Sequence, residues 1–529
     1  MNKINTIHFS IVISLLLLVG ILLRSKAIST PFWVDEFSTA SQAKQLVKFG
    51  LSAFSRSDIG MEPNNILPHI VVAVSFTLFG FSVAAARTPF IIAGLFLPVL
   101  VFLVARKNFS FRVAIGAGLM LATSYWQLAW SSQARGYVFQ EVIALLLLLV
   151  YSWQTKKTLF KYVLLAILGI LGIATHISLI LFIAAFVLTE LYRNKSIFIA
   201  VIQKYKRQLI LCAIIFAISL LTIFFVTSFK LQNNVWYYHA FLWKEQTIIS
   251  MFAFIGLFST FFEKREKTLT FFFTISSILY FSFFFFVFPP YSTRYILPIY
   301  PLLIIFAAKG IEFITISLSK RHRTLLFSFF IFFIFLNGNE FTFKPKPFYS
   351  PNHFMREIPL VDYDEVYKII KSELLNDPSA AVIDTWPDRA LWYLPEYAQN
   401  LYIFRWSEFS GTSNGISMET EFAYDIEGKK ILPRSGTPQL GFVSDLKDLT
   451  DVMNNHKTGV IWIDDTSLPA EVLTFVYENF STLLHTEHLA ADDNPYSIWP
   501  GTLYKWDEKT LRPSSKQVYT DLHKSGTML

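Results

Sequence analysis

Long apolar stretches separated by short polar segments fill the first two thirds of the chain. The first of them, IVISLLLLVGILL, ends at Leu23, and comparable stretches recur up to residue 338. Because a helix needs roughly 20 mostly apolar residues to cross a bilayer, the pattern predicts an α-helical polytopic membrane protein. No small-residue cleavage site follows the first stretch. We therefore expect a retained helix there and not a removed signal peptide.

Basic clusters between the apolar stretches predict the topology, because Lys and Arg concentrate in the cytoplasmic loops of membrane proteins. The clusters lie at residues 105–112, 155–157, 192–207, 263–267 and 319–323. A pair of apolar stretches separates each cluster from the next, so all of them can face the cytoplasm. The count is then about 11 spans with the N-terminus inside. The predicted spans lie near 9–23, 88–105, 113–130, 137–153, 159–175, 177–192, 209–228, 245–262, 269–288, 296–318 and 324–338.

The apolar stretch at 66–80 does not fit this series. Its sequence, ILPHIVVAVSFTLFG, contains Pro68 and His69 and has only about 15 residues, fewer than a span needs. We expect a helix that lies at the outer interface. Residues 25–87 then form one large extracytoplasmic loop that follows the first span.

The composition changes after residue 338. The rest of the chain, 339–529, contains short strand-like runs at 380–384, 400–406 and 459–464, which alternate with helical patterns. Such alternation is typical of a small α/β domain. The sequence therefore predicts a membrane domain at 1–338 and, by the span count, an extracytoplasmic α/β domain at 339–529.

The overall composition agrees with a membrane location. Of the 529 residues, 53% are hydrophobic and only 16% are charged, and the mean hydropathy is +0.45. A soluble protein of this composition would expose apolar patches that promote association. The net charge of +8 lies largely in the loop clusters, so we predict contact with membrane lipids and no nucleic-acid partner. The single cysteine, Cys212, makes no intramolecular disulfide.

The predicted outer loops carry ionisable side chains next to apolar stretches. These are Asp35, Glu36, Glu62, Arg87, Arg135, His176 and Arg294. Each has a simpler reading, because an acid can cap a helix and an arginine can reach lipid headgroups. Taken together, the acids and arginines favour a functional site that binds phosphate and accepts a proton. Arginine binds phosphate through a planar fork, and a carboxylate accepts a proton from an attacking hydroxyl or amine. The combination suits group transfer from a phospholipid-linked donor at the outer face.

Other motifs argue against a metal or a nucleotide cofactor. HTEH (485–488) has metal-ligand residue types, but we expect both histidines on a helix surface without the flanking pattern of a zinc site. The sequence contains no Gly-rich phosphate loop, so neither ATP nor a nucleotide sugar is expected. We predict no metal and no cofactor.

Four segments carry a family resemblance. The chain resembles the GT-C class of membrane glycosyltransferases, which use polyprenyl-phosphate sugars; the protein O-mannosyltransferases and the aminoarabinose transferases of lipid A belong to this class. The resemblance covers roughly residues 1–320 and implies a GT-C-like membrane domain that needs no metal. The segments are WVDEFSTA (33–40), EPNNILPHIVVAVSFTLFGFSVAAARTP (62–89), WSSQARGYVFQ (130–140) and PPYSTRYILPIYPLLIIFAAKGIE (289–312).

The resemblance implies roles for the acids. Asp35 matches the acid proposed as catalytic base in this class, and Glu36 is its partner in the motif. Glu62 precedes Pro63 where many relatives have His-Pro-Pro. Acceptor binding and orientation of Asp35 are both open for Glu62.

The resemblance also implies contacts with the donor. Arg294 matches a basic residue near the lipid phosphate, and Arg135 and Arg87 are further candidates for phosphate binding. His176, Tyr137 and Tyr295 are candidate substrate contacts. Hydrogen bonding within the protein is an equal alternative for His176.

The sequence as a whole predicts a multi-pass glycosyltransferase of the cell membrane. It would transfer a sugar, hexosyl or pentosyl, from a polyprenyl-phosphate donor to a glycolipid, polysaccharide or protein acceptor on the extracytoplasmic face. The alternative is a transporter or flippase of lipid-linked glycans. The sequence shows no inverted repeat, and the acids lie outside the predicted spans and not at the membrane midplane, so we favour the transferase.

Overall fold

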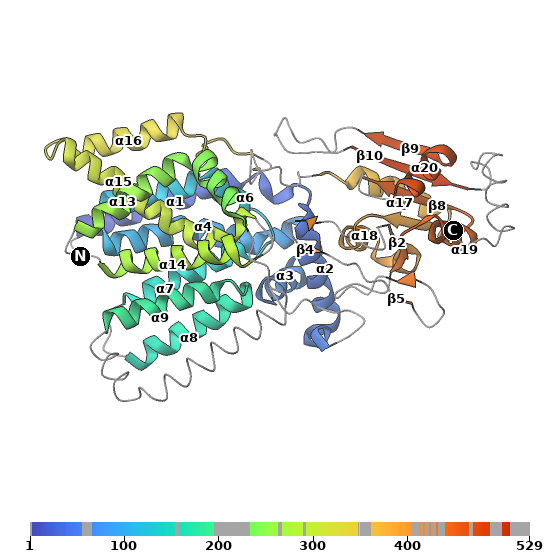
Figure 1. Ribbon diagram of the computed structural model, residues 1–529, viewed down its shortest axis with the longest axis horizontal. Coiled ribbons are helices and arrows are strands. Elements are labelled where there is room, and N and C mark those ends of the chain that lie inside the picture. The colour runs from blue at the N-terminus through green and yellow to red at the C-terminus, as the bar shows by residue number, and fades with distance from the viewer. Residues whose placement is uncertain are drawn as a thin grey trace.

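The computed structural model has two parts, a helical bundle and a sheet domain (Figure 1). Figure 1 shows them side by side along the long axis, with the N-terminal residues in the bundle. The described residues are 3–55, 66–153, 158–194, 233–262, 267–288, 292–346, 349, 361–404, 412–413, 416–417, 423–424, 430–431, 440–464, 469–486 and 500–507.

Long apolar helices form the bundle. Four described helical segments are long and apolar enough to cross a membrane: Ile7–Arg24, Val83–Asn108, Thr268–Phe286 and Thr293–Leu318. The pair Val235–Glu245 and Thr247–Phe262, bent by 96°, is a fifth candidate. The protein is therefore a polytopic membrane protein, as predicted, while the predicted span at 209–228 lies outside the described residues.

The helices of this part have the following bounds: α1 (Lys3–Arg24), α2 (Val34–Phe49), α3 (Ile66–Phe79), α4 (Val83–Asn108), α5 (Phe111–Thr123), α6 (Tyr125–Ser131), α7 (Tyr137–Tyr151), α8 (Thr158–Thr175), α9 (Leu179–Arg193), α12 (Val235–Ala240), α13 (Thr247–Phe262), α14 (Lys267–Phe286), α15 (Tyr300–Leu318) and α16 (Arg323–Asn337). Short non-α turns are η1 (Ala27–Ser29), η2 (Gly50–Ser55), the π-helical η3 (Phe241–Glu245) and η4 (Thr293–Ile299).

Small residues bring two of these helices into direct contact. A Cβ added to Gly256 of α13 would collide with the Phe306 carbonyl oxygen, and one added to Gly310 of α15 would collide with that of Phe252. The two backbones therefore touch at these glycines, which is the usual way for membrane helices to pack closely. This contact holds α15, and with it the η4 turn that precedes α15, firmly in the bundle.

Two helices lie between the bundle and the sheet domain. Figure 1 shows α2 running across the end of the bundle, with α3 beside it. With 14 residues, α3 is about 21 Å long, shorter than the hydrocarbon core of a bilayer. Gly80, with φ of 80°, provides the turn from α3 into α4, and the Ser82 side chain caps α4 by accepting from the Ala85 N–H. The chain thereby returns to the bundle at Val83.

The sheet domain is a mixed α/β fold. Its eight-stranded sheet has the order β5-β6-β7-β2-β1-β8-β10-β9. The central strands β7, β2, β1 and β8 are parallel, and β8, β10 and β9 pair antiparallel. The bounds are α17 (Asp364–Asn376), β1 (Ala381–Asp384), α18 (Pro387–Tyr393), η5 (Pro395–Asn400), β2 (Leu401–Phe404), β3 (Thr412–Ser413), β4 (Ile416–Ser417), β5 (Ala423–Tyr424), β6 (Lys430–Ile431), β7 (Gly441–Val443), α19 (Leu446–Asn455), β8 (Gly459–Ile463), α20 (Ala470–Asn479), β9 (Ser481–Thr486) and β10 (Gly501–Trp506). The α/β domain and three of its strands are thus as predicted.

One expectation for this domain was wrong. His485, predicted on a helix surface, lies in strand β9, paired with Thr502 of β10, and its Nδ1 is 2.8 Å from the Thr502 hydroxyl. The run STLLHT contains two threonines, which suit a pleated surface, and pairing with β10 decides its conformation. His488 lies outside the described residues.

A buried arginine fills the crevice at the carboxyl ends of β1 and β8. Arg389 of α18 pairs with Asp384, the last residue of β1, and with Asp464, which follows β8; its Nη1 is 2.6 Å from Asp464 Oδ2. Such crevices between parallel strands often bind ligands. Here the guanidinium occupies the crevice and fixes α18 on the sheet.

Helix α18 docks the sheet domain on α2. The Trp392 ring lies 4.8 Å from that of Phe32, and Tyr393 and Tyr363 contact Phe37. Lys44 of α2 donates to the Trp392 carbonyl at 3.2 Å, and its Nζ lies 3.7 Å from the centre of the indole ring. Aromatic and cation–π contacts of this kind place the sheet domain next to the first residues of α2.

Candidate active site

Asp35 lies in the first turn of α2 and meets two arginines from distant segments. Its Oδ2 accepts a hydrogen bond from Arg294 Nη1 at 2.5 Å and lies 3.6 Å from Arg135 Nη2. Arg135 Nη1 also donates to the Asp35 carbonyl oxygen at 3.0 Å. The Asp35 side chain is 29% exposed, so this acid is paired and still accessible. Three of the predicted residues therefore form one cluster at the end of the bundle that faces the sheet domain.

Four aromatic rings surround the Arg294 guanidinium. Its carbon lies 5.5 to 5.9 Å from the ring centres of Trp33, Trp130, Tyr137 and Tyr295. Cation–π attraction is strongest where the cation is poorly hydrated, and the Arg294 side chain is only 19% exposed. The rings hold the guanidinium against Asp35 and leave it accessible on one side.

Trp33 and Trp130 are the functional neighbours that the sequence analysis missed. They contact each other edge to face, with centres 5.8 Å apart. Each stands within a segment that carried the resemblance, WVDEFSTA or WSSQARGYVFQ. A signal was therefore present, since a tryptophan precedes the charged residues in both segments.

Arg135 follows α6 in the short connection to α7. Besides Asp35, its Nη1 contacts the Thr39 hydroxyl at 3.3 Å. Burial lowers the pKa of Arg135, but the Asp35 carboxylate and Tyr137 outweigh this and raise the pKa above its ordinary value. Arg135 consequently stays charged at every physiological pH.

A small hollow adjoins Arg135 and contains His176. It is lined by Thr39, Pro68, Arg135, Gly136, Tyr137, Thr175 and His176. Burial, and then Arg135 and Arg294, lower the pKa of His176 to about 4, so the imidazole is neutral at neutral pH. Its Nδ1 accepts from the Ser178 backbone N–H at 3.2 Å. The neutral tautomer then carries its proton on Nε2, which can donate to a ligand.

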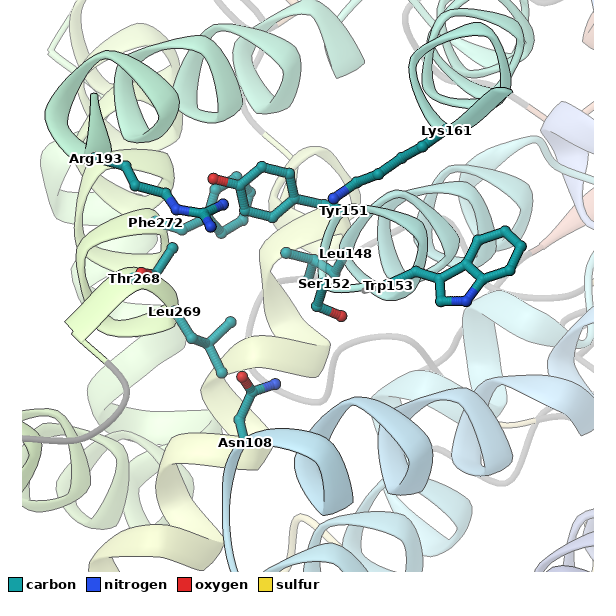
Figure 2. Close-up of a pocket in the computed structure, with 10 residues that line it drawn as sticks. All are labelled: Asn108, Leu148, Tyr151, Ser152, Trp153, Lys161, Arg193, Thr268, Leu269 and Phe272. Atoms are coloured by element: carbon teal, nitrogen blue, oxygen red, sulfur yellow. The ribbon is translucent and has the colours of Figure 1, made fainter. Parts of the chain in front are cut away.

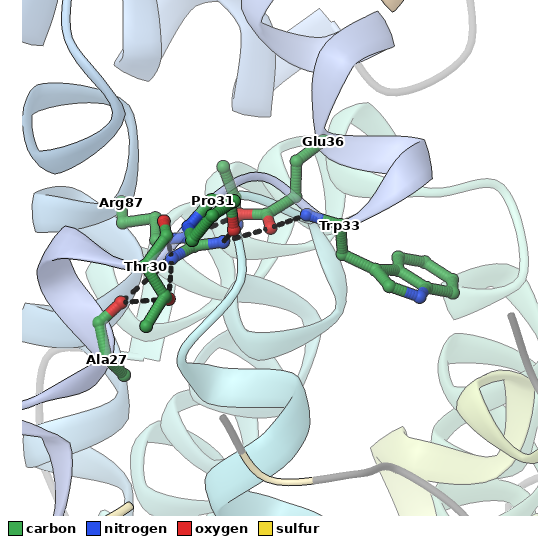
Figure 3. Close-up of polar contacts among 7 residues, drawn as sticks. Ala27, Thr30, Pro31, Trp33, Glu36 and Arg87 are labelled. Carbon is green, nitrogen blue, oxygen red and sulfur yellow. Dashed lines mark hydrogen bonds and ion pairs between the residues drawn. The ribbon is translucent and has the colours of Figure 1, made fainter. Parts of the chain in front are cut away.

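Glu36 and Arg87 form a separate, buried ion pair (Figure 3). Arg87 Nε and Nη2 donate to the two Glu36 carboxylate oxygens at 2.8 and 2.6 Å. The remaining Arg87 donors go to carbonyl groups of Ala27, Thr30 and Pro31. Glu36 also accepts from the Trp33 N–H at 2.8 Å, as a helix-capping acid does.

This geometry corrects the expectations for both residues. The side chains of Arg87 and Glu36 are 2% and 0% exposed, and all five guanidinium N–H groups of Arg87 have protein acceptors. Glu36 Oε1 is also occupied, by the Ala134 N–H at 2.6 Å. Arg87 therefore has no donor to offer a lipid phosphate, and Glu36 has no accessible oxygen. The pair instead fastens the segment before α2 to α4 and to the α6–α7 connection, which positions Asp35 and Arg135.

The remaining predictions have the following places in the structure. Tyr137 and Tyr295 flank His176, with ring centres 5.9 and 6.1 Å from the imidazole. Glu62 lies outside the described residues. Within the described ranges, no group of three or more His, Cys, Asp or Glu side chains could hold a metal ion.

Known protein structures are similar to this one over most of its length. No family model matches the sequence, and no curated protein matches it. ArnT from Cupriavidus metallidurans, in the apo state, has a TM-score of 0.54 and 13% identity, covering 97% of this chain and 100% of that chain. The same protein bound to undecaprenyl phosphate gives the same values. The archaeal oligosaccharyltransferase AglB from Archaeoglobus fulgidus, in complex with an inhibitory peptide and a dolichol-phosphate, has a TM-score of 0.53 and 12% identity. The match covers 87% of this chain and 70% of that chain.

The chain has the GT-C fold. This confirms the predicted fold class, an α-helical membrane domain followed by an α/β domain. At identities of 12 and 13% the likeness concerns the fold alone, because one fold can carry many different functions.

Proposed function

We propose that this protein is a membrane glycosyltransferase that takes a sugar from a polyprenyl-phosphate donor. One observation carries the proposal: a single accessible carboxylate, Asp35, lies against two charged arginines at a membrane-proximal end of the bundle. The similar structures of ArnT and AglB contain undecaprenyl phosphate and dolichol-phosphate, which supports a lipid phosphate as the ligand of such a site.

Arg294 and Arg135 would bind the donor phosphate. Both stay charged, and a guanidinium matches a phosphate with two parallel hydrogen bonds. In the transition state the bond between the anomeric carbon and the phosphate oxygen breaks, and negative charge accumulates on the departing polyprenyl phosphate. Two fixed cations stabilise that charge, so protonation of the leaving group is not needed.

Asp35 would accept the proton of the acceptor. An acceptor hydroxyl or amine attacks the anomeric carbon, its proton passes to Asp35, and the electron pair of the broken bond leaves with the phosphate. The ion pair with Arg294 favours the ionised carboxylate that a base requires. The partial exposure of Asp35 leaves room for an acceptor.

His176, Tyr137 and Tyr295 are suited to contact the sugar or the phosphate. Tyr137 and His176 line the small hollow beside Arg135, and the Tyr295 ring lies next to His176. His176 Nε2 can donate a hydrogen bond without carrying a charge. Glu36 and Arg87 act by positioning Asp35. For Glu62, acceptor binding and orientation of Asp35 both stay open.

The reaction would take place on the outer surface of the cell membrane. Two basic clusters lie in the described part of the chain, at 105–112 and 319–323, and they lie at the ends of α4 and α15 that are away from Arg87 and Arg294. Because basic loops concentrate in the cytoplasm, this arrangement supports an extracytoplasmic Asp35 cluster. The sheet domain docks on α2 through Trp392 and Lys44, next to Asp35. We propose that the domain is extracytoplasmic and selects the acceptor, whether a glycolipid, a polysaccharide or a protein.

Transfer of label from a polyprenyl-phosphate sugar tests the proposal. The full-length protein is reconstituted in liposomes with donors that carry different labelled hexoses or pentoses, and with a panel of acceptors. We expect release of polyprenyl phosphate and label on the acceptor, both dependent on Asp35. Movement of the intact labelled lipid across the bilayer, with no cleavage, would instead identify a transporter.

A further inference from the structure

A second polar hollow lies in the bundle far from Asp35 (Figure 2). It has a volume of about 330 Å³ and opens between the ends of α4, α7, α8, α9 and α14. Both basic and apolar side chains line it: Lys161 and Arg193 are basic, and Leu269 and Phe272 are apolar. No step of the proposed reaction uses these residues.

The hollow and the Asp35 cluster lie at opposite membrane surfaces. Helix α4 runs from Arg87, near Asp35, to Asn108 in the hollow, and α7 runs from Tyr137 to Tyr151. Helix segments of this length measure about 20–30 Å, close to the thickness of the hydrocarbon core. The hollow therefore lies at headgroup level on the surface away from the reaction.

Two cations converge on one tyrosine in this hollow. Lys161 Nζ lies 5.2 Å from the centre of the Tyr151 ring, and the Arg193 guanidinium carbon lies 5.8 Å from it. Figure 2 shows the two side chains reaching toward Tyr151 from different helices. Within the described part of the chain, Lys161 forms no ion pair.

The nearby carboxylate does not neutralise both cations. Glu190 Oε2 is 4.0 Å from Arg193 Nη1, a loose contact. The same carboxylate accepts from the Tyr151 hydroxyl and, at 2.6 Å, from Asn194 Nδ2. One acid shared among three partners leaves the hollow with a net positive charge.

We propose that this hollow binds the phosphate of an anionic membrane lipid, held between Lys161 and Arg193. Trp153, 45% exposed, would lie at the membrane–water boundary, as tryptophans commonly do. Basic pockets between membrane helices bind anionic headgroups in this way. The inference does not depend on the proposed function, because it concerns the opposite surface.

Cross-linking at the rim of the hollow tests the proposal. A photoreactive benzoylphenylalanine replaces Trp153 in the full chain, which is reconstituted in phosphatidylcholine vesicles that contain either phosphatidylglycerol or undecaprenyl phosphate. We expect preferential cross-linking to an anionic lipid. The arm that gives the product identifies the source of the phosphate, a phospholipid or the polyprenyl carrier.

Charge variants complete the test. Lys161→Gln combined with Arg193→Gln should reduce the cross-link at least ~10-fold, since each lost contact is a charge-assisted hydrogen bond. The matched control is Arg321→Gln, an exposed basic residue between α15 and α16 at the same end of the bundle; it should have no effect. Equal cross-linking to phosphatidylcholine, or an equal loss in the control, would overturn the proposal. If the double variant does not fold, the protein that keeps Lys161 and Arg193 still tests the proposal, because its cross-linking to anionic lipid can be compared with its cross-linking to phosphatidylcholine.

Discussion

Arg294 Nη1 donates to Asp35 Oδ2 at 2.5 Å, across 259 positions of sequence. Asp35 is the second residue of α2 and Arg294 is the second residue of η4, so the first turns of these two segments meet at one surface of the bundle. Their contact neutralises each charge in the absence of substrate. A donor phosphate would compete with Asp35 for the guanidinium, and that exchange would place a base next to the reacting lipid.

Asp35→Asn should abolish turnover but not donor binding. The amide keeps the size of the side chain and cannot accept a proton, so we expect a loss of at least ~100-fold in the transfer rate, the lower end for removal of a general base. Binding of undecaprenyl phosphate should be unchanged or tighter, because Arg294 loses its competing anion. Asp451→Asn in α19, exposed on the sheet domain, is the control. Full activity of Asp35→Asn in folded protein would contradict the role of a base and leave this carboxylate only its ion pairs with Arg294 and Arg135.

Arg294→Gln and Arg135→Gln should both weaken donor binding. Each removes a charge-assisted hydrogen bond worth ~1.5–3 kcal/mol, so the Kd for a polyprenyl phosphate should rise about tenfold or more. A titration of purified variants with undecaprenyl phosphate measures this directly. Unchanged affinity in both variants would contradict the assignment of the phosphate site.

Arg87→Gln should act on stability and not on donor affinity. The change leaves Glu36 buried without its ionic partner, which typically costs about 3–5 kcal/mol. We expect a lower melting temperature and poor recovery from membranes. The fraction that folds should bind undecaprenyl phosphate with ordinary affinity, and a large loss of affinity in that fraction would argue for direct phosphate contact by Arg87.

Acidification should destabilise the protein through His176. Its pKa is about 4 in the folded state and about 6.5 in an unfolded chain. Between these values the unfolded state binds more protons, so stability rises with pH and falls as the pH drops from about 6.5 to about 4. The melting temperature, measured across this range, should decline less steeply in His176→Gln. Identical slopes would mean that other groups cause the decline.

Trp392→Ala should loosen the sheet domain from α2. The change removes the ring contact with Phe32 and the cation–π contact with Lys44. We expect faster proteolysis between the two parts, together with weaker use of acceptor and little change in donor binding. The control is Tyr477→Ala, an exposed aromatic residue of α20 that lies elsewhere on the same domain. Equal losses of donor and acceptor affinity would contradict a role of the domain in acceptor selection.

Local patterns in the sequence predict the division into a membrane bundle and an α/β domain. Apolar length decides whether a helix can cross a bilayer, and this is a local property of the chain. Alternating strand and helix patterns are also local, and β1, β2 and β8 lie where the sequence predicted strands. The resemblance identified Asp35, Arg135 and Arg294 as candidates, and these three residues do come together.

Long-range packing determines which charged residues can face a substrate. Asp35 and Glu36 are adjacent, yet one is 29% exposed and the other fully buried against Arg87. Neighbouring positions on a helix point in different directions, so a one-residue step separates an accessible acid from a structural ion pair. The aromatic rings around Arg294 likewise come from segments that meet only after the helices have packed. Burial and pairing depend on these long-range contacts, which no local pattern in the sequence contains.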